Sequence, residues 1–284
     1  MTSPSSTWRP VQAISADNIF QARAQLHQAV QLLTAVGISF VPPRPDDSHT
    51  SILWSAKSEA FFSQPFGNNH RFQLALNPVN LTCSVIEADG SRLVTLNLNG
   101  ATLEQTFNDL KFFLEDHGLP RDVFTMERHF ELPDYPDRWN SAFDTSDTQA
   151  FELLSNAYSN AYPFIQNIAQ HNSKAGDQLI WPHHFDMAIL ISMDEDKSIG
   201  IGLSPGDDSY STPYYYVNVW PYPSPEQSIS YKLSFGDWHT AGWTGMVLSY
   251  DQLSGEGDPS RQKTMVDTFL REALAHAHAV IESQ

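Results

Sequence analysis

The spacing of apolar residues near the start of the chain is typical of an amphipathic helix. Asp17 suits the N-cap of such a helix and Gly37 suits its C-terminal cap. The pattern therefore predicts a first helix over residues 17–37. The apolar positions that recur at helical spacing are Ile19, Phe20, Ala24, Leu26, Val30, Leu33 and Val36.

Short apolar runs predict several strands in the stretch that follows. The Ala-Asp-Gly sequence at residues 88–90 is a strong signal for a tight turn, so the two runs beside it are expected to form a hairpin. A further strand is predicted over residues 125–132. The earlier runs lie at residues 52–54, 72–76, 81–87 and 93–98.

Residues with capping chemistry predict the next helix. Thr102 is followed three residues later by Gln105, which is the spacing of a capping box. The helix that begins here is expected to reach Asp116, because Gly118 fits the C-terminal cap and Pro120 cannot continue a helix.

The second half of the chain repeats this order of helix, strands and helix. A long helix is predicted over residues 147–171, interrupted or kinked near Pro163, and an Ala-rich amphipathic helix over residues 260–282. The strands predicted between them cover residues 179–193, 199–203, 214–220 and 245–249.

This order of elements favours an α+β fold. Short, hairpin-linked strands favour antiparallel sheets flanked by helices over a doubly wound parallel sheet. Residues 17–284 are therefore predicted to form one integrated unit of two similar halves, residues 17–132 and 147–284. A segment rich in Pro and Asp at residues 133–148 joins the halves. Residues 1–16 are expected to be disordered or extended.

The charge of the chain limits its partners. The chain has 284 residues with 33 acidic and 16 basic side chains, so its formal net charge is −17. An acidic surface repels phosphate backbones and no Lys/Arg-rich run offsets this, so we expect no nucleic-acid partner. No segment approaches the ~20 consecutive apolar residues of a membrane span. With a start that lacks signal-peptide features, this predicts a soluble, cytoplasmic protein without a membrane partner.

The remaining composition narrows the chemistry. Hydrophobic residues make up 41% of the chain and aromatic residues 12%, which is enough for a sizeable core. The single cysteine, Cys83, excludes an intramolecular disulfide and a Cys-rich metal site. The motifs of phosphate-binding loops, serine hydrolases and zinc proteases are all missing from the sequence.

The most informative candidate site lies in the predicted strand over residues 179–193. Alternate side chains of a strand share a face, so His184 and Asp186 are expected to lie together. A His and a carboxylate so placed can both reach one divalent cation, or the carboxylate can orient the imidazole of a catalytic base. A buried polar pair that neighbouring backbone satisfies is the structural alternative.

A second candidate group lies in the tyrosine-rich strand and the turn before it. Gly200 and Gly202 predict that another group packs close to the backbone of their strand. Asp207 follows a Pro-Gly turn, and Tyr214 and Tyr216 share one face of the next strand. That face could line a pocket for a polar aromatic or sugar-like ligand. Tyrosine pairs that stabilise an antiparallel sheet are an equal alternative.

A glycine-bounded aromatic loop at residues 236–245 adds a third group. Its His239 could complete, with His184 and Asp186, the set of two His and one carboxylate that suits zinc or non-haem iron. Trp238 is large enough to form a rim. We therefore expect His239 to lie in a concavity with His184 or Asp207, rimmed by Tyr214 or Tyr216 and by Trp238.

Four motifs together resemble a known family. They are Trp-Pro-His-His-Phe-Asp at residues 181–186, Gly-Leu-Ser-Pro-Gly-Asp at 202–207, Tyr-Tyr-Tyr with Trp-Pro-Tyr-Pro at 214–223, and Trp-His-Thr-Ala-Gly-Trp at 238–243. The combination resembles a bacterial family of proteins of unknown function. The resemblance spans most of the chain and implies one integrated fold, but it implies no activity.

Two functional hypotheses follow. The first is an enzyme that depends on a divalent metal or on a His/Asp pair, most simply a hydrolase of a small polar substrate. The second is a non-catalytic ligand-binding or scaffold protein with a satisfied polar core of His, Asp and Tyr. The candidate catalytic residues and metal ligands are His184, Asp186 and His239, and the candidate substrate-binding residues are Asp207, Tyr214, Tyr216 and Trp238.

Overall fold

The protein has an α+β fold with two antiparallel sheets, as the sequence predicts. The computed structural model describes residues 7–67, 71–135, 141–224 and 231–283. The chain divides into two compact units. Unit 1 consists of Met1–Ala16, Asn156–Gln178 and Asp186–Gln284, and unit 2 consists of Asp17–Ser155 and Leu179–Phe185.

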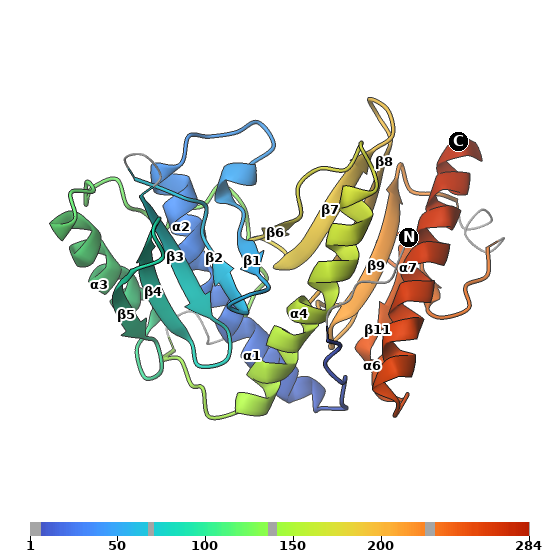
Figure 1. Ribbon diagram of the computed structural model, residues 1–284, viewed down its shortest axis with the longest axis horizontal. Helices are drawn as coiled ribbons and strands as arrows, with labels where there is room; N and C mark the ends of the chain where they lie inside the picture. Colours follow the sequence, from blue (N-terminus) through green and yellow to red (C-terminus); the bar gives the residue numbers. More distant parts are fainter. Residues whose placement is uncertain (1–6, 68–70, 136–140, 225–230, 284) are drawn as a thin grey trace. The chain divides into compact units, whose positions relative to one another are not determined.

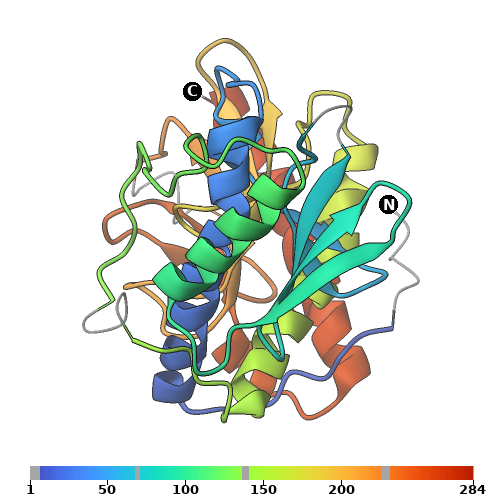
Figure 2. The ribbon, with the colours of Figure 1, turned by 90° about the vertical axis from the view of Figure 1, so that its left-hand side faces the viewer.

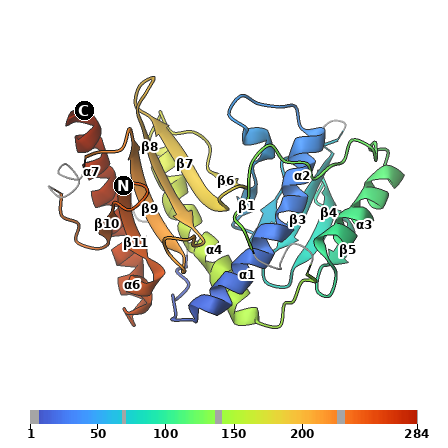
Figure 3. The same ribbon diagram turned by 180° about the vertical axis from the view of Figure 1, so that it is seen from behind.

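Unit 2 is built around a sheet of five strands in sequential order, β1-β2-β3-β4-β5. Its helices α1 and α2 run across one face of that sheet, with α3 beside them (Figures 2 and 3). The strands are β1 (Leu53–Ser55), β2 (Ala60–Phe62), β3 (Phe72–Asn77), β4 (Thr82–Glu87) and β5 (Arg92–Asn97). The helices are α1 (Ala16–Ala29), α2 (Gln31–Phe40), the 3-10 turn η1 (Ser48–Thr50) and α3 (Leu103–Asp116).

The first predicted helix is real but its end is not where the sequence places it. The helical stretch is interrupted at Val30, and Gly37 lies inside α2 instead of capping it. A Cβ at Gly37 would lie 2.3 Å from the backbone oxygen of His49. The glycine therefore serves the close approach of η1 to α2, which a helical pattern alone cannot reveal.

The capping box predicts the start of α3 correctly. The Thr102 side chain accepts from the Gln105 backbone N–H, and the Gln105 side chain accepts from the Thr102 backbone N–H. Residues 125–132, in contrast, do not form the expected strand. The backbone N–H of Thr125 donates to Ser39 Oγ at 3.0 Å, and Ser39 Oγ donates to the Thr125 carbonyl at 3.4 Å. A side chain thus satisfies both backbone groups, and Thr125 pairs with no strand among the described residues.

Unit 1 contains five strands of the second sheet, in the order β10-β11-β9-β8-β7. Helix α7 and the part of α4 in this unit lie against one face (Figure 1). The strands are β7 (Asp186–Ser192), β8 (Ser198–Ser204), β9 (Tyr214–Trp220), β10 (Asp237–His239) and β11 (Gly245–Ser249). The helices are α4 (Thr148–Gln170), α6 (Tyr250–Ser254) and α7 (Pro259–Ser283). The short elements β2, β10 and α6 are absent from the sequence prediction.

Alternation along β9 separates the two faces of this sheet. Tyr215 and Val217 are fully buried on the side that α7 covers. Tyr214, Tyr216 and Asn218 therefore lie on the other face, as the sequence predicts. The chain before α1 also belongs to unit 1. Its residues 7–15 have no regular secondary structure. The backbone N–H of Val11 donates to Gln262 Oε1 at 2.9 Å, and the Gln262 side chain donates back to the Val11 carbonyl at 2.8 Å.

The strand expected over residues 179–193 is two strands separated by a turn. β6 (Leu179–Trp181) ends before Pro182, and β7 begins at Asp186. Phe185 has a φ of 58°, and its backbone N–H donates to the Trp181 carbonyl at 2.7 Å. This left-handed residue breaks the alternation of faces on which the placement of His184 beside Asp186 depended. That premise of the sequence analysis is wrong.

The segment expected to join two halves lies within unit 2. Part of it, residues 136–140, lies outside the described residues, as do residues 1–6 of the expected N-terminal segment. Phe143 is buried and exchanges backbone hydrogen bonds with Gly100 and Ala101 at 2.8 and 2.9 Å. The boundary between the units falls inside α4, and the chain returns to unit 2 at Leu179–Phe185.

This return leads to a first prediction. Cleavage at a protease site inserted beside the exposed Ser146 should leave two fragments that elute together in size-exclusion chromatography. The reason is that the second fragment still supplies Leu179–Phe185 to unit 2. Ile52 and Ile180 exchange backbone hydrogen bonds of 2.9 and 2.8 Å across this join. Separate elution of the fragments, each folded, would contradict the description of unit 2.

Candidate functional site

One face of the unit 1 sheet gathers most of the candidate residues. Tyr216 on β9 donates a short hydrogen bond from its hydroxyl to Oδ2 of Asp186, the first residue of β7. Asp186 is 9% exposed, so its carboxylate is held away from water. This hydrogen bond links two strands of unit 1 through their side chains and uses Oδ2 of the carboxylate.

The Pro-Gly turn ends in a carboxylate whose role is local. Asp207 Oδ1 accepts backbone N–H groups of Ser209 and Tyr210 at 2.8 and 3.0 Å. Its Oδ2 accepts the Tyr214 hydroxyl at 2.6 Å. Gly206 has a φ of 109°, a conformation that favours glycine. Asp207 therefore closes the turn and fixes the position of the Tyr214 ring.

Both ring nitrogens of His239 are occupied. Nε2 lies 2.7 Å from the carbonyl oxygen of Ala241, which can only accept, so Nε2 carries the proton. Nδ1 then accepts the hydroxyl of Tyr210 at 3.1 Å. The imidazole also packs on Trp243 with ring centroids 4.4 Å apart. His239 thus donates to backbone, and a metal could bind Nδ1 only in place of the Tyr210 hydroxyl.

The aromatic rings on this face form a continuous chain of contacts. Centroid distances run from 4.7 Å between Tyr210 and Tyr214 to 6.2 Å between Tyr214 and Tyr216. Trp243 contacts both Tyr214 and Tyr216, at 6.3 and 6.5 Å. We call this group the aromatic face; its residues are Tyr210, Tyr214, Tyr216, His239 and Trp243.

Glycines on the neighbouring strands make room for this face. A Cβ at Gly202 would lie 2.6 Å from the Tyr216 hydroxyl, and one at Gly200 would lie 2.3 Å from Asn218 Oδ1. A Cβ at Gly245 would lie 2.5 Å from Cζ3 of Trp243. Side chains of β9 and of the β10–β11 loop thus cover the backbone that the sequence suggested was bare.

The tryptophan beside the tyrosines is Trp243 and not Trp238, which the sequence analysis named as the rim. Trp238 pairs with Met246 in the β10–β11 ladder and faces the buried side of the sheet. Its indole N–H donates to the Tyr231 carbonyl at 3.0 Å. Trp243 lies among the tyrosines instead. Strand alternation around His239 would have put Trp238 on the opposite face, and that was the available signal.

Burial keeps the tyrosines of this face protonated. Desolvation raises the pKa of Tyr214 and of Tyr216 well above the usual value, and the Asp207 and Asp186 carboxylates raise them further. The pKa of Tyr210 is also raised, mainly by desolvation. All three hydroxyls therefore act as fixed donors at neutral pH.

The two adjacent histidines of the central motif belong to unit 2. They lie in the turn between β6 and β7, where His184 is exposed and His183 is half-buried. Desolvation lowers the pKa of His183 to about 4, with a contribution from His184. The His183 ring contacts Trp181 and Phe130, at centroid distances of 6.2 and 5.8 Å.

His27 on α1 holds this turn in place. Its Nε2 donates to the Pro182 carbonyl at 2.7 Å, and its Nδ1 accepts the Tyr135 hydroxyl at 2.8 Å. The Gln31 side chain donates to the same carbonyl at 3.2 Å. His27 could not be recognised from the sequence, because it lies inside an apolar helical pattern and belongs to no known motif.

The predicted catalytic and metal set is divided between the units. His184 lies in unit 2, whereas Asp186 and His239 lie in unit 1 and make the separate hydrogen bonds described above. Among the described residues, no group of three or more His, Cys, Asp or Glu side chains is arranged to hold a metal ion. The metal hypothesis stays a prediction without a ligand set to support it.

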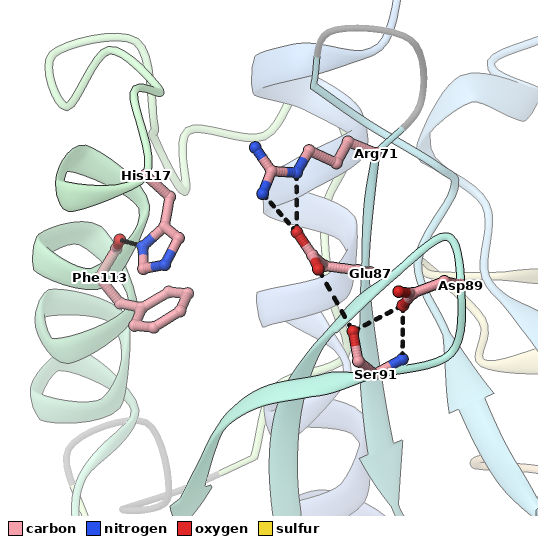
Figure 4. A network of polar contacts seen from close by, with 6 residues as sticks. All are labelled: Arg71, Glu87, Asp89, Ser91, Phe113 and His117. Atoms are coloured by element: carbon pink, nitrogen blue, oxygen red, sulfur yellow. Dashed lines mark hydrogen bonds and ion pairs between the residues drawn. The ribbon is translucent and has the colours of Figure 1, made fainter.

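Another polar network, in unit 2, is a surface feature (Figure 4). Arg71 pairs with Glu87 at the end of the β4–β5 hairpin, and the Ser91 hydroxyl lies 3.2 Å from Glu87 and 2.6 Å from Asp89. The Arg71 side chain is 57% exposed, so the ion pair adds little stability. The network closes a hairpin and offers no buried chemical group.

Comparison with known proteins adds no functional information. No family model, no curated protein and no solved structure matches the chain significantly. The family resemblance of the motifs therefore stays a prediction. The helices within the described residues are all too short or too polar to span a membrane.

The fit of Tyr216 over Gly202 gives a second prediction. Gly202→Ala should lower the free energy of unfolding by about 1–3 kcal/mol, because the added methyl displaces the Tyr216 ring and its bond to Asp186. Gly257→Ala is the control, since a Cβ there meets no atom within 4 Å. Urea denaturation measures both variants, and equal stability for the two would contradict the packing described.

The burial of His27 gives a third prediction. Desolvation lowers its pKa from 6.5 to about 4, so the folded state holds it neutral where the unfolded chain binds a proton. Its contribution to stability is complete above pH 6.5 and is lost as the pH falls through 4. Between about pH 7.5 and 4.5 the wild type should lose about 2–3 kcal/mol more unfolding free energy than His27→Gln.

The control for this pH series is His171→Gln, which replaces an exposed histidine at the end of α4. Urea denaturation at a series of pH values gives the slope of the unfolding free energy against pH for each variant. A His27→Gln variant with the same pH dependence as wild type would show that His27 does not titrate differently in the folded state.

Proposed function

We propose that the protein binds a small, uncharged polar molecule on the aromatic face of unit 1, without catalysing a reaction there. The observation that supports this most is the state of the side chains. Tyrosine, histidine and carboxylate groups are already held by hydrogen bonds to one another, and both imidazole nitrogens of His239 are engaged.

The hydrogen-bonding capacity that remains defines the ligand. Tyr214 and Tyr216 use their protons on Asp207 and Asp186, so their hydroxyl oxygens can only accept further hydrogen bonds, and the Tyr214 oxygen already interacts with the Ser204 side chain. A ligand must therefore supply donors. The rings of Tyr216 and Trp243 supply apolar surface, and both residues are half-buried, so part of each is exposed.

A ring with several hydroxyl groups meets both requirements. Its hydroxyls donate to the phenolic oxygens while its flatter, apolar side lies on the indole or phenol. An anion fits poorly because two carboxylates lie beneath the tyrosines in a chain of net charge −17. A neutral sugar-like molecule is the class that the face favours.

A calorimetric titration of the protein with a panel of neutral mono- and disaccharides tests this proposal. At least one sugar should bind, and Trp243→Ala should weaken that binding by about tenfold through lost stacking. Tyr222→Ala is the matched control, because Tyr222 is a 43% exposed aromatic residue of the same unit that contacts Trp220 and not this face.

Two results would count against the proposal. The first is no binding of any sugar in the panel, and the second is unchanged binding by Trp243→Ala. The hydrolase hypothesis gives a different result. Turnover of a nitrophenyl glycoside or ester that is lost in His239→Ala would show that His239 acts as a catalytic base.

A further inference from the structure

Arg23 on α1 is a buried cation, and two of its three guanidinium nitrogens lack a hydrogen-bond partner among the described residues. Its side chain is 5% exposed, and its Nε and Nη1 make no hydrogen bond. No carboxylate of the described residues forms an ion pair with it. Arg23 makes a cation–π contact with Phe20, whose ring centroid lies 5.5 Å from the guanidinium carbon. An aromatic ring stabilises a cation but accepts no conventional hydrogen bond.

The electrostatic neighbours of His27 include Arg23 and the two histidines of the turn, and Asp47 acts on His183. His27 lies one helical turn away on the same face of α1. The charges that act on His27 come from Arg23, His184 and His183, and no carboxylate is among them. In a chain with twice as many acidic as basic residues, this is a local exception.

Hydrogen bonds from His27 and Gln31 hold the turn between β6 and β7 in place. His27 and Gln31 both donate to the Pro182 carbonyl, which fixes the residues that carry His183 and His184 to the helix that carries Arg23. In this turn His184 is exposed and His183 is half-buried. The N–H groups of the Arg23 guanidinium and the two imidazoles of the turn therefore all belong to unit 2.

An isolated buried charge is costly, because it loses its hydration without gaining a partner. A ligand that supplies the missing partner offsets this cost. A guanidinium presents several N–H donors in one plane and matches the oxygens of carboxylates and phosphates. We propose that Arg23 is the centre of an oxyanion site in unit 2, which binds a small molecule through a phosphate or carboxylate group, with the His183–His184 turn beside it.

This site is independent of the proposed sugar-binding face. It lies in unit 2, uses other residues and binds an anionic ligand, whereas the aromatic face of unit 1 binds a neutral one. Failure of either proposal leaves the other to be decided by its own experiment.

The test is thermal unfolding of the full chain in sodium phosphate, sodium acetate and sodium chloride at matched ionic strength. If Arg23 binds an oxyanion, phosphate or acetate should raise the melting temperature at low concentration and with saturation, relative to chloride. Arg23→Met should abolish that rise. Arg121→Met, which removes a surface arginine of the same unit, should retain it.

The form of the response separates binding from a general salt effect. Phosphate stabilises many proteins by exclusion from their surface, and that effect grows steadily with concentration without saturating. A rise of this kind, equal in wild type and Arg23→Met, overturns the proposal. So does the absence of any difference from chloride. A saturable response to phosphate alone supports a phosphate-bearing ligand, and a response to acetate alone supports a carboxylate.

A second variant decides the matter if Arg23→Met does not fold. Arg23→Lys keeps the charge but loses the planar donor set, so direct calorimetric titration with the anion that stabilises wild type should show affinity reduced by about tenfold. Affinity equal to that of wild type would mean that the anion binds elsewhere, and it would overturn the proposal.

Discussion

Two hydrogen bonds to one carbonyl oxygen, that of Pro182, fix the position of the turn that carries His183 and His184. His27 and Gln31 donate them from successive turns of the helical stretch formed by α1 and α2. They hold the turn after β6 against unit 2, while β7 continues into unit 1. The motif that reads as one strand is therefore shared between two compact units. Its two histidines and its aspartate take part in separate networks as a consequence.

The face of the unit 1 sheet shows a second constraint, which is the need to satisfy polar groups that the sheet buries. Tyr216 lies over Gly202 and donates to Asp186, and the missing side chain at residue 202 is what makes that position accessible. Each group on the face is fixed by another before any ligand arrives. Such an arrangement costs little to organise on binding, because the side chains are already held in place.

The parts of the fold that depend on local chemistry could be predicted from the sequence. The capping box at Thr102, the hairpin after Glu87 and the alternation of Tyr214 to Tyr216 all follow from neighbours a few residues apart. The failures have non-local causes. Gly37 serves the approach of η1, and the Ser39 hydroxyl replaces a strand partner for Thr125. No local pattern announces either contact.

The same distinction between local and non-local causes applies to the residues of the candidate site. Tyr214 and Tyr216 were placed correctly because strand period alone decides their face. His184 was misplaced because Phe185 adopts a left-handed conformation, which its sequence neighbours do not signal. Trp243 was missed because it lies in a loop, where no period applies. His27 was missed because its importance comes from a carbonyl 155 residues away.

Arg23 differs in charge from several other side chains of the described core that have unsatisfied polar atoms. Gln28 and Thr34 also have buried atoms without hydrogen bonds, but both side chains are neutral. An unpaired neutral group costs about 1–3 kcal/mol, and an unpaired charge costs more. A neutral amide or hydroxyl can remain in a core as a small defect. A guanidinium cannot lose its proton to escape the cost, so the sequence must gain something by keeping it there. Recognition of an oxyanion is the gain that we propose, because no carboxylate of the described residues forms an ion pair with Arg23 and its Nε and Nη1 make no hydrogen bond.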